Sequence, residues 1–149
     1  MQTKDNAKFH IVLVIGAVEK KGKILIAKRS FEELQAPGKW ALPGGKVEIK
    51  GSDMDTLEKT LAREIKEEVG VEVDSSMKYI RSGSFVRVDK SSVISVLFLC
   101  KWLNGKAEAL EDSIDIAWIS SDELDKYDFA DDVKKSLRES FKIVNSNHI

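Results

Sequence analysis

Three glutamates, Glu64, Glu67 and Glu68, lie close together near the end of a stretch that we predict to be a helix. At about 100° per residue, their side chains project from neighbouring positions beside its apolar stripe. Like charges three or four residues apart destabilise a helix, and a divalent cation reverses the sign of that effect. Carboxylate oxygens suit Mg²⁺ or Mn²⁺. The cluster therefore predicts a metal site; the alternative is an ordinary acidic helix end in which Arg63 pairs with Glu67.

The helix that carries these glutamates is expected from about Asp53 to Val69. Ser52 and Asp53 are suitable N-caps, and Ser52 with Asp55 can form a capping box. Gly70 can end the helix because glycine adopts a left-handed conformation without strain. The stripe expected to face the core consists of Met54, Leu57, Leu61, Ile65 and Val69.

This region resembles the Nudix box, the signature of hydrolases that cleave a nucleoside diphosphate linked to another moiety. The residues that match the signature are Gly45, Arg63, Glu64, Ile65, Glu67, Glu68, Gly70 and Val71, and they follow Trp-Ala-Leu-Pro-Gly at positions 40–44. The spacing from Gly45 to Arg63 is four residues longer than in the signature, which places an insertion in Ile49–Met54. Asp55 stands where the signature has a glutamate. We expect the insertion to re-aim the loop beside the metal site.

The resemblance implies an α/β/α sandwich (α/β, in the α+β sense) built on a mixed sheet. It also implies a metal shell formed by the Gly45 carbonyl and by Glu64, Glu67 and Glu68, with Mg²⁺, or alternatively Mn²⁺, as the cofactor. Arg63 would orient these carboxylates through charge-assisted hydrogen bonds. Glu48 corresponds to an acidic position near the metals. The base is either a box glutamate or a late-loop residue, Glu111 or Asp112, ahead of Trp118, and the catalytic set is Glu67, Glu64, Arg63 and Glu111.

Four further residues are candidates for substrate binding, and each has a plainer interpretation. Arg29 can meet a phosphate or simply be a solvated strand end. Trp40 can stack on a base or pack beneath the loop. Asp131 and Asp132 can read a base or merely favour a helix N-terminus.

The substrate class is predicted from features that mark other subgroups of the family and are absent from this sequence. Relatives that act on ADP-ribose tend to have a proline after the box, and no proline follows Pro43. Those that act on dinucleoside polyphosphates tend to have a tyrosine near Arg87–Asp89, where there is none. Leu34 stands where the coenzyme A subgroup has an arginine. Nucleoside triphosphates, including modified deoxynucleotides, are therefore the expected substrates; ADP-ribose or a nucleotide sugar is the alternative.

Two alternative functions are considered beside hydrolysis. One is a module that binds a nucleotide without cleaving it, and the other is a diphosphate isomerase of related fold. The first usually lacks a box glutamate, and all three are present here. The second would need additional metal-binding histidines and a reactive cysteine, whereas the two histidines lie near the chain ends and Cys100 lies in an apolar run.

The composition fits one domain over residues 1–149, with 1–8 and 145–149 expected to be flexible. The net charge of −1 gives no basis for general nucleic-acid binding. The longest apolar runs are too short for a membrane span. Residues 1–10 contain no hydrophobic signal core, so we expect no secretory signal. A lone cysteine forms no internal disulfide, so we expect a cytoplasmic protein with Cys100 buried and reduced. The sequence leaves open whether it is a homodimer.

Alternating and apolar runs predict strands at 10–18, 23–29, 77–88, 93–102 and 114–119, with a bend at Gly83. A small helix is expected to open at Ser120, and a final helix at 131–144. Hairpins combined with one long crossover predict a mixed sheet covered on both faces.

Overall fold

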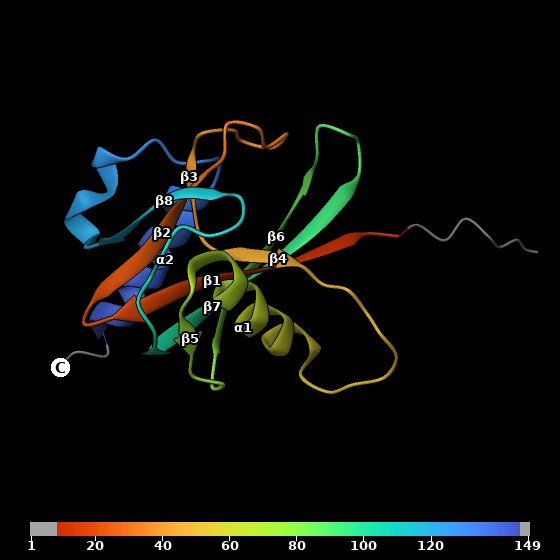
Figure 1. The fold of residues 1–149 in the computed structure, drawn as a ribbon, viewed down its shortest axis with the longest axis horizontal. Coiled ribbons are helices and arrows are strands. Elements are labelled where there is room, and N and C mark those ends of the chain that lie inside the picture. The colour runs from red at the N-terminus through yellow and green to blue at the C-terminus, as the bar shows by residue number, and fades with distance from the viewer. Residues whose placement is uncertain (1–8, 147–149) are drawn as a thin grey trace, which may run out of the picture.

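A computed structural model describes residues 9–146 and shows a mixed sheet with a helix on either side (Figure 1). The strands are β1 (Ile11–Lys20), β2 (Lys23–Arg29), β3 (Trp40–Ala41), β4 (Gly44–Lys46), β5 (Glu72–Val73), β6 (Lys78–Val86), β7 (Ser92–Asn104) and β8 (Ser113–Ile119). Neighbouring strands run in the order β3-β2-β1-β7-β5, while β4 pairs with β1, β6 with β7 and β8 with β2. Strands β1 and β7 are parallel, which confirms the predicted mixed sheet.

The helices are α1 (Thr56–Val69), the short 3-10 helix η1 (Ser121–Lys126) and α2 (Val133–Ser146). Because side chains alternate along a strand, the long strands β1, β2, β7 and β8 contribute to both core layers. Val14, Leu25 and Cys100 pack with Leu61 and Ile65 of α1. Burial raises the pKa of the Cys100 thiol to about 12, so it is an inert core residue, as predicted.

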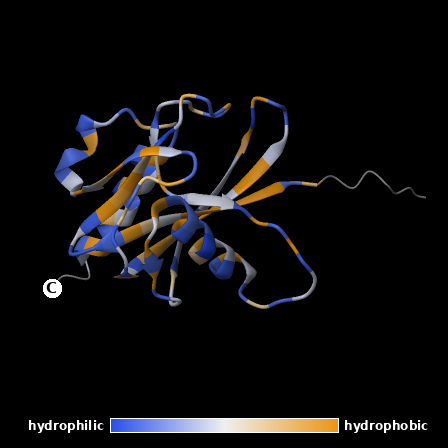
Figure 2. Cartoon of the chain, viewed as in Figure 1, coloured by the Kyte–Doolittle hydropathy of each residue, from blue (hydrophilic) through white to orange (hydrophobic). Residues whose placement is uncertain are grey.

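The opposite sheet face packs against α2. Ala17, Ile26 and Leu99 lie there with Leu137 and Phe141, all buried. Figure 2 shows the apolar residues concentrated on the strands and the polar residues on the outer surface of the helices. The sheet is therefore covered on both faces, and the predicted sandwich is confirmed.

The start of α1 differs from the prediction. The helix begins at Thr56, and its N-cap Asp55 has a left-handed φ of 55°; within the described residues, its carboxylate accepts no capping hydrogen bond. Asp53 instead accepts hydrogen bonds from the Met54 amide at 2.8 Å and from the Lys59 ammonium at 2.9 Å. The predicted capping box was therefore wrong. Met54 is 76% exposed and lies outside the buried stripe, because the inserted residues leave the body as a loop before the helix begins.

Other boundaries agree closely with the sequence analysis. Gly70 ends α1 with a φ of 76° and donates to the Lys66 carbonyl. Ser120 and Glu123 form a capping box at η1. Strand β6 passes through Gly83 in register with Ser95, and its irregularity lies between Tyr79 and Arg81 instead of at the predicted glycine bend.

Residues 145 and 146 continue α2, while 1–8 and 147–149, which we expected to be flexible, lie outside the described residues. Every helix in the described range 9–146 is too short or too polar to span a bilayer.

Candidate active site

The glycine pair of β4 is held against the last turns of α1. Gly44 and Gly45 pair with Ile15 and Val14 of the central strand β1. A Cβ atom added at Gly45 would lie 2.1 Å from Glu64 Oε1, and one added at Gly44 would lie 2.1 Å from the Val14 carbonyl oxygen. Both positions therefore need glycine for close approach, one to a carboxylate and the other to backbone.

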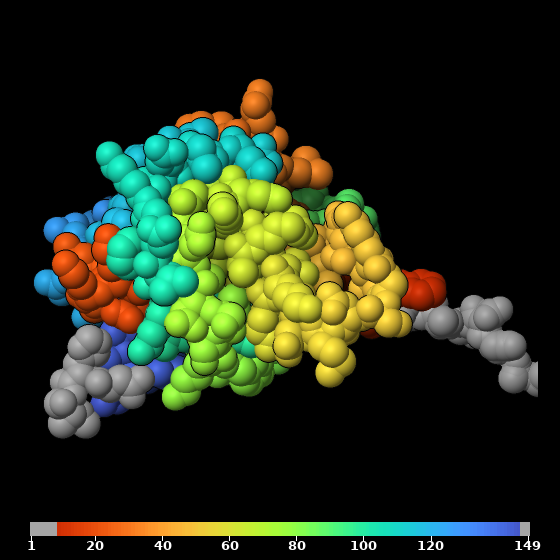
Figure 3. Space-filling view, turned by 60° about the horizontal axis from the view of Figure 1, so that its bottom comes forward, coloured from red at the N-terminus to blue at the C-terminus, as the bar shows by residue number. Residues whose placement is uncertain are grey.

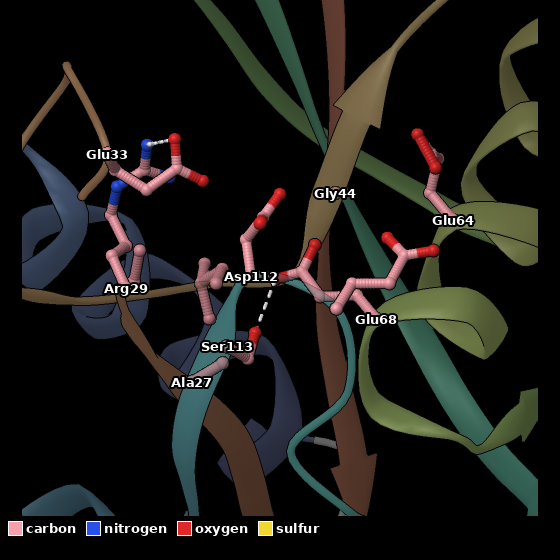
Figure 4. Close-up of a pocket in the computed structure, with 11 residues that line it drawn as sticks. Ala27, Arg29, Glu33, Gly44, Glu64, Glu68, Asp112 and Ser113 are labelled. Atoms are coloured by element: carbon pink, nitrogen blue, oxygen red, sulfur yellow. Dashed lines mark hydrogen bonds and ion pairs between the residues drawn. The ribbon is translucent and has the colours of Figure 1, made fainter. Parts of the chain in front are cut away.

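A polar hollow of about 190 Å³ lies between β2, β4, the end of α1 and the loop before β8. It is lined by Ala27, Arg29, Glu33, Ala41, Leu42, Gly44, Glu64, Glu68, Glu111, Asp112 and Ser113. Figure 4 shows Arg29 on one side, the Glu64 and Glu68 carboxylates on the other, and Asp112 between them. Five carboxylates against one arginine make the hollow strongly acidic, which favours a bound cation.

Glu68 is the most enclosed of these carboxylates. Burial raises its pKa to about 7, against the opposing effect of a hydrogen bond from the Gly44 backbone. The Ser113 hydroxyl also donates to Glu68 Oε1, at 3.3 Å. Burial likewise raises the pKa of Glu64, with Arg63 opposing the shift. A cation between the two carboxylates would offset this cost of keeping them ionised.

Glu67 faces a different direction from its two neighbours. Arg63 Nη1 donates to Glu67 Oε1 at 3.1 Å and lies 3.7 Å from Glu64 Oε2. Glu67 and Glu48 line a second hollow on the other side of α1. Across residues 9–146, no three acidic side chains close into a metal-binding group. Mutual repulsion and the Arg63 ion pair explain why the carboxylates spread along the ridge of the helix.

The donor set nevertheless fits a hard divalent cation. It offers carboxylate oxygens, including those of Glu64 and Glu68, two partly buried side chains whose pKa values are raised. Beside them, Gly44 and Gly45 leave space that a larger residue would fill. The structure thus brings together Gly45, Glu64 and Glu68, with Glu67 next to them on the helix.

The other predicted site residues separate into two groups. Arg29 and Glu111 line the acidic hollow, and Arg29 Nε donates to the Gln35 carbonyl at 2.8 Å. Trp40 packs edge-on against Tyr127, with ring centroids 5.0 Å apart. Asp131 and Asp132 are exposed just before α2. These last three residues line neither of the two described hollows, and their substrate roles stay predictions.

Two lining residues were missed by sequence reasoning. Ser113 is a buried polar residue at the start of an apolar strand, a signal that could have been used. Glu33 lies in the loop after β2, 3.7 Å from the Arg29 guanidinium, and nothing in the sequence of an exposed loop indicates that approach.

Comparisons with known proteins agree with this geometry. Residues 8–140 match the family model described as NUDIX domain. The chain is 28% identical to proteins named nucleoside triphosphatase NudI from Escherichia coli O139:H28 and from Shigella flexneri, over 85% of this chain and 93% of theirs.

Solved structures show the same fold. The MutT protein from Methanosarcina mazei Go1 has a TM-score of 0.72 at 24% identity, covering 95% of this chain and 99% of that one. The NUDIX domain of Shewanella oneidensis NrtR, solved with ADP ribose, has a TM-score of 0.74 at 17% identity, covering 95% of this chain and 94% of that one. With the box residues gathered at the end of α1 and the family model matched over most of the chain, this protein belongs to the Nudix hydrolase family and is a pyrophosphohydrolase.

Proposed function

We propose that this protein hydrolyses nucleoside triphosphates, including modified deoxynucleotides, and that it requires Mg²⁺ or Mn²⁺. The observation that carries the proposal is the acidic hollow at the end of α1, with Arg29 facing Glu64 and Glu68 across it. The relatives named nucleoside triphosphatase, 28% identical over 85% of this chain, support the substrate class.

The cation would be held by the Gly45 carbonyl and by Glu64, Glu67 and Glu68. When bound, it supplies positive charge that neutralises the non-bridging phosphate oxygens. Arg63 keeps Glu67 in place through its 3.1 Å hydrogen bond, and Ser113 orients Glu68. These partners fix carboxylates that would otherwise repel one another.

The hydrolytic step needs a base and a leaving group. The water oxygen forms a bond to phosphorus as the bridging P–O bond breaks, and the water proton passes to a carboxylate. The bridging oxygen leaves on pyrophosphate or on the nucleoside monophosphate, according to which phosphorus is attacked. Glu111 is our candidate for this base, and its position in the lining of the hollow, close enough to Glu64 to contribute to that residue's raised pKa, supports the choice. A box glutamate is the alternative base.

The substrate is held by groups around this centre. Arg29 lines the hollow at the end of β2, where its guanidinium contacts Glu33 and the Gln35 carbonyl, and it would bind a phosphate oxygen. Trp40, Asp131 and Asp132 are the proposed contacts for the nucleoside, on the side of β3 and α2.

A substrate panel tests the proposal. Nucleoside triphosphates, modified deoxynucleoside triphosphates, ADP-ribose and nucleotide sugars would be incubated with Mg²⁺, and phosphate release measured after coupling to a pyrophosphatase or a phosphatase. We expect the highest kcat/KM for a triphosphate, with pyrophosphate as product and no turnover in a chelator. A higher kcat/KM for ADP-ribose than for any triphosphate would overturn the proposed substrate class. So would a result in which compounds bind but none of them is turned over.

A further inference from the structure

A second hollow, of about 540 Å³, lies on the other side of α1 from the acidic one. One wall is the loop Glu48–Asp53, and the other is the face of α1 that carries Lys59, Arg63 and Glu67. Figure 3 shows the loop, in gold, standing away from the yellow-green helix with a recess between them. This loop contains the four residues that lengthen the spacing between Gly45 and Arg63, so the hollow is a product of the insertion.

Basic side chains distinguish this hollow from the first. Lys50, Lys59 and Arg63 line it, together with the carboxylates of Glu48, Asp53 and Glu67. The acidic hollow, by contrast, has Arg29 as its one basic lining residue among those described. An anionic group that extends beyond the box glutamates therefore meets more positive charge on the side of the inserted loop.

The acidic partners here are weakly engaged or already committed. Lys59 pairs with Asp53 at 2.9 Å, and those side chains are 58% and 63% exposed. Such a surface pair contributes little, so a phosphate can replace the carboxylate. Under the proposed function, Glu67 would be neutralised by the divalent cation, which leaves Lys50, Lys59 and Arg63 against Glu48 and Asp53.

The position of Glu67 connects the two hollows. Glu64 and Glu68 face the acidic hollow, and Glu67 and Arg63, on the same two turns of α1, face the second one. Phosphates that extend past Glu67 would therefore enter the hollow that Lys50 and Lys59 line.

We propose that the second hollow binds the terminal phosphates of a nucleoside triphosphate, and hence the pyrophosphate product, through Lys50, Lys59 and Arg63. This inference rests on the proposed function and adds a basis for selectivity: the inserted loop makes the enzyme prefer triphosphates to diphosphates of the same nucleoside. Lys50 and Lys59 are the residues to test, because Arg63 also holds the box glutamates.

The test compares Lys50→Ala, Lys59→Ala and the double variant with Lys66→Ala. Lys66 is an exposed lysine of the same helix, it pairs with Glu72, and it lines neither hollow, so it controls for the loss of one charge. The double variant should lower kcat/KM for the triphosphate about tenfold or more, the scale of one charge-assisted hydrogen bond, and leave that for the diphosphate unchanged. Lys66→Ala should change neither. An equal loss on both nucleotides, or no loss, would overturn the inference.

A binding measurement separates this inference from the proposed function. Calorimetric titration with pyrophosphate and Mg²⁺ needs no turnover, and the double variant should bind pyrophosphate about tenfold more weakly than the parent. If the parent hydrolyses no nucleoside triphosphate, the proposed function fails. If the double variant binds pyrophosphate as tightly as the parent and Lys66→Ala do, the proposed phosphate site is wrong, whatever the substrate panel shows.

Discussion

At the scale of single residues, the box glutamates differ because their surroundings differ. Glu68 is enclosed by Gly44 and Ser113, and burial raises its pKa to about 7. Glu67 is 41% exposed and paired with Arg63 at 3.1 Å. Two adjacent glutamates therefore differ in energy: the ionised form of Glu68 is destabilised by burial, whereas Glu67 is exposed to solvent and paired with Arg63.

Replacing Glu67 with glutamine tests its proposed role as a ligand. Glu67→Gln should reduce kcat by about two to four orders of magnitude in saturating Mg²⁺, the scale of losing an acid–base or electrostatic contribution. Steady-state kinetics on the preferred nucleotide would measure this. Glu58→Gln, in the first turn of the same helix and lining neither hollow, is the matched control. A Glu67→Gln protein that is folded and turns over at the parent rate would contradict the assignment.

The environment of Glu68 predicts a pH-dependent stability in the presence of a chelator. Its folded pKa is about 7 against an ordinary 4.5, so between these values the folded state holds a proton that the unfolded state has released. Stability therefore falls as pH rises through this window, and the loss is complete above the folded pKa. Glu68→Gln carries no charge and should be more stable than the parent by about 1–3 kcal/mol above that window.

Urea denaturation of both proteins across the window would measure the difference. We expect the two free energies of unfolding to converge below the ordinary carboxyl pKa of 4.5. A constant difference at every pH would show that the carboxylate does not carry the effect.

At the scale of elements, the site depends on how β4 is placed against β1 and α1. The adjacent glycines of β4 have different neighbours: Gly45 faces the flexible Glu64 side chain, and Gly44 faces the Val14 backbone oxygen. A side chain can move aside at little cost, whereas the backbone of the central strand cannot. The same substitution at the two positions should therefore have different consequences.

Gly45→Ala should displace the Glu64 carboxylate and reduce kcat by about 10²-fold, as a misplacement of about 1 Å can do, with little loss of stability. Gly44→Ala should destabilise the protein by about 1–3 kcal/mol, because its Cβ overlaps backbone. Activity assays combined with urea denaturation of both variants would separate the two effects. If Gly45→Ala lost as much stability as Gly44→Ala, the contact with Glu64 would not be the cause.

At the scale of the whole molecule, the sheet divides the core into a layer under α1, which carries the site, and a layer under α2. Leu137 of α2 is fully buried on the second side. Leu137→Ala should lower stability by about 2–5 kcal/mol through the cavity that it leaves. The turnover of the protein that stays folded should remain near the parent rate, because the box lies across the sheet.

Thermal unfolding and assays well below the unfolding temperature would measure the two quantities. Lys135→Ala, an exposed position on the same helix, is the control. An unchanged unfolding temperature in Leu137→Ala would mean that α2 does not pack as described.

How far the sequence predicts this protein depends on how local each signal is. Strand patterns, the glycine that ends α1 and the box residues are local in sequence, so the sandwich and the set of candidate ligands were predictable. The predicted start of α1 was wrong because Ser52, Asp53 and Asp55 can all act as N-caps, and the local sequence does not distinguish among them. The structure places α1 after Asp55.

The sequence by itself determined which residues could bind a cation and which elements would carry them. Only the tertiary structure decided which of these residues meet. Glu33, Ser113 and the acidic late loop come from distant parts of the chain to line the same hollow as Glu68, and the inserted loop forms the second hollow only by lying beside α1. The reason is physical. Burial, repulsion between carboxylates and the resulting pKa shifts depend on distances between side chains, and the pairing of the strands sets those distances. The spacing of residues along the sequence does not contain them.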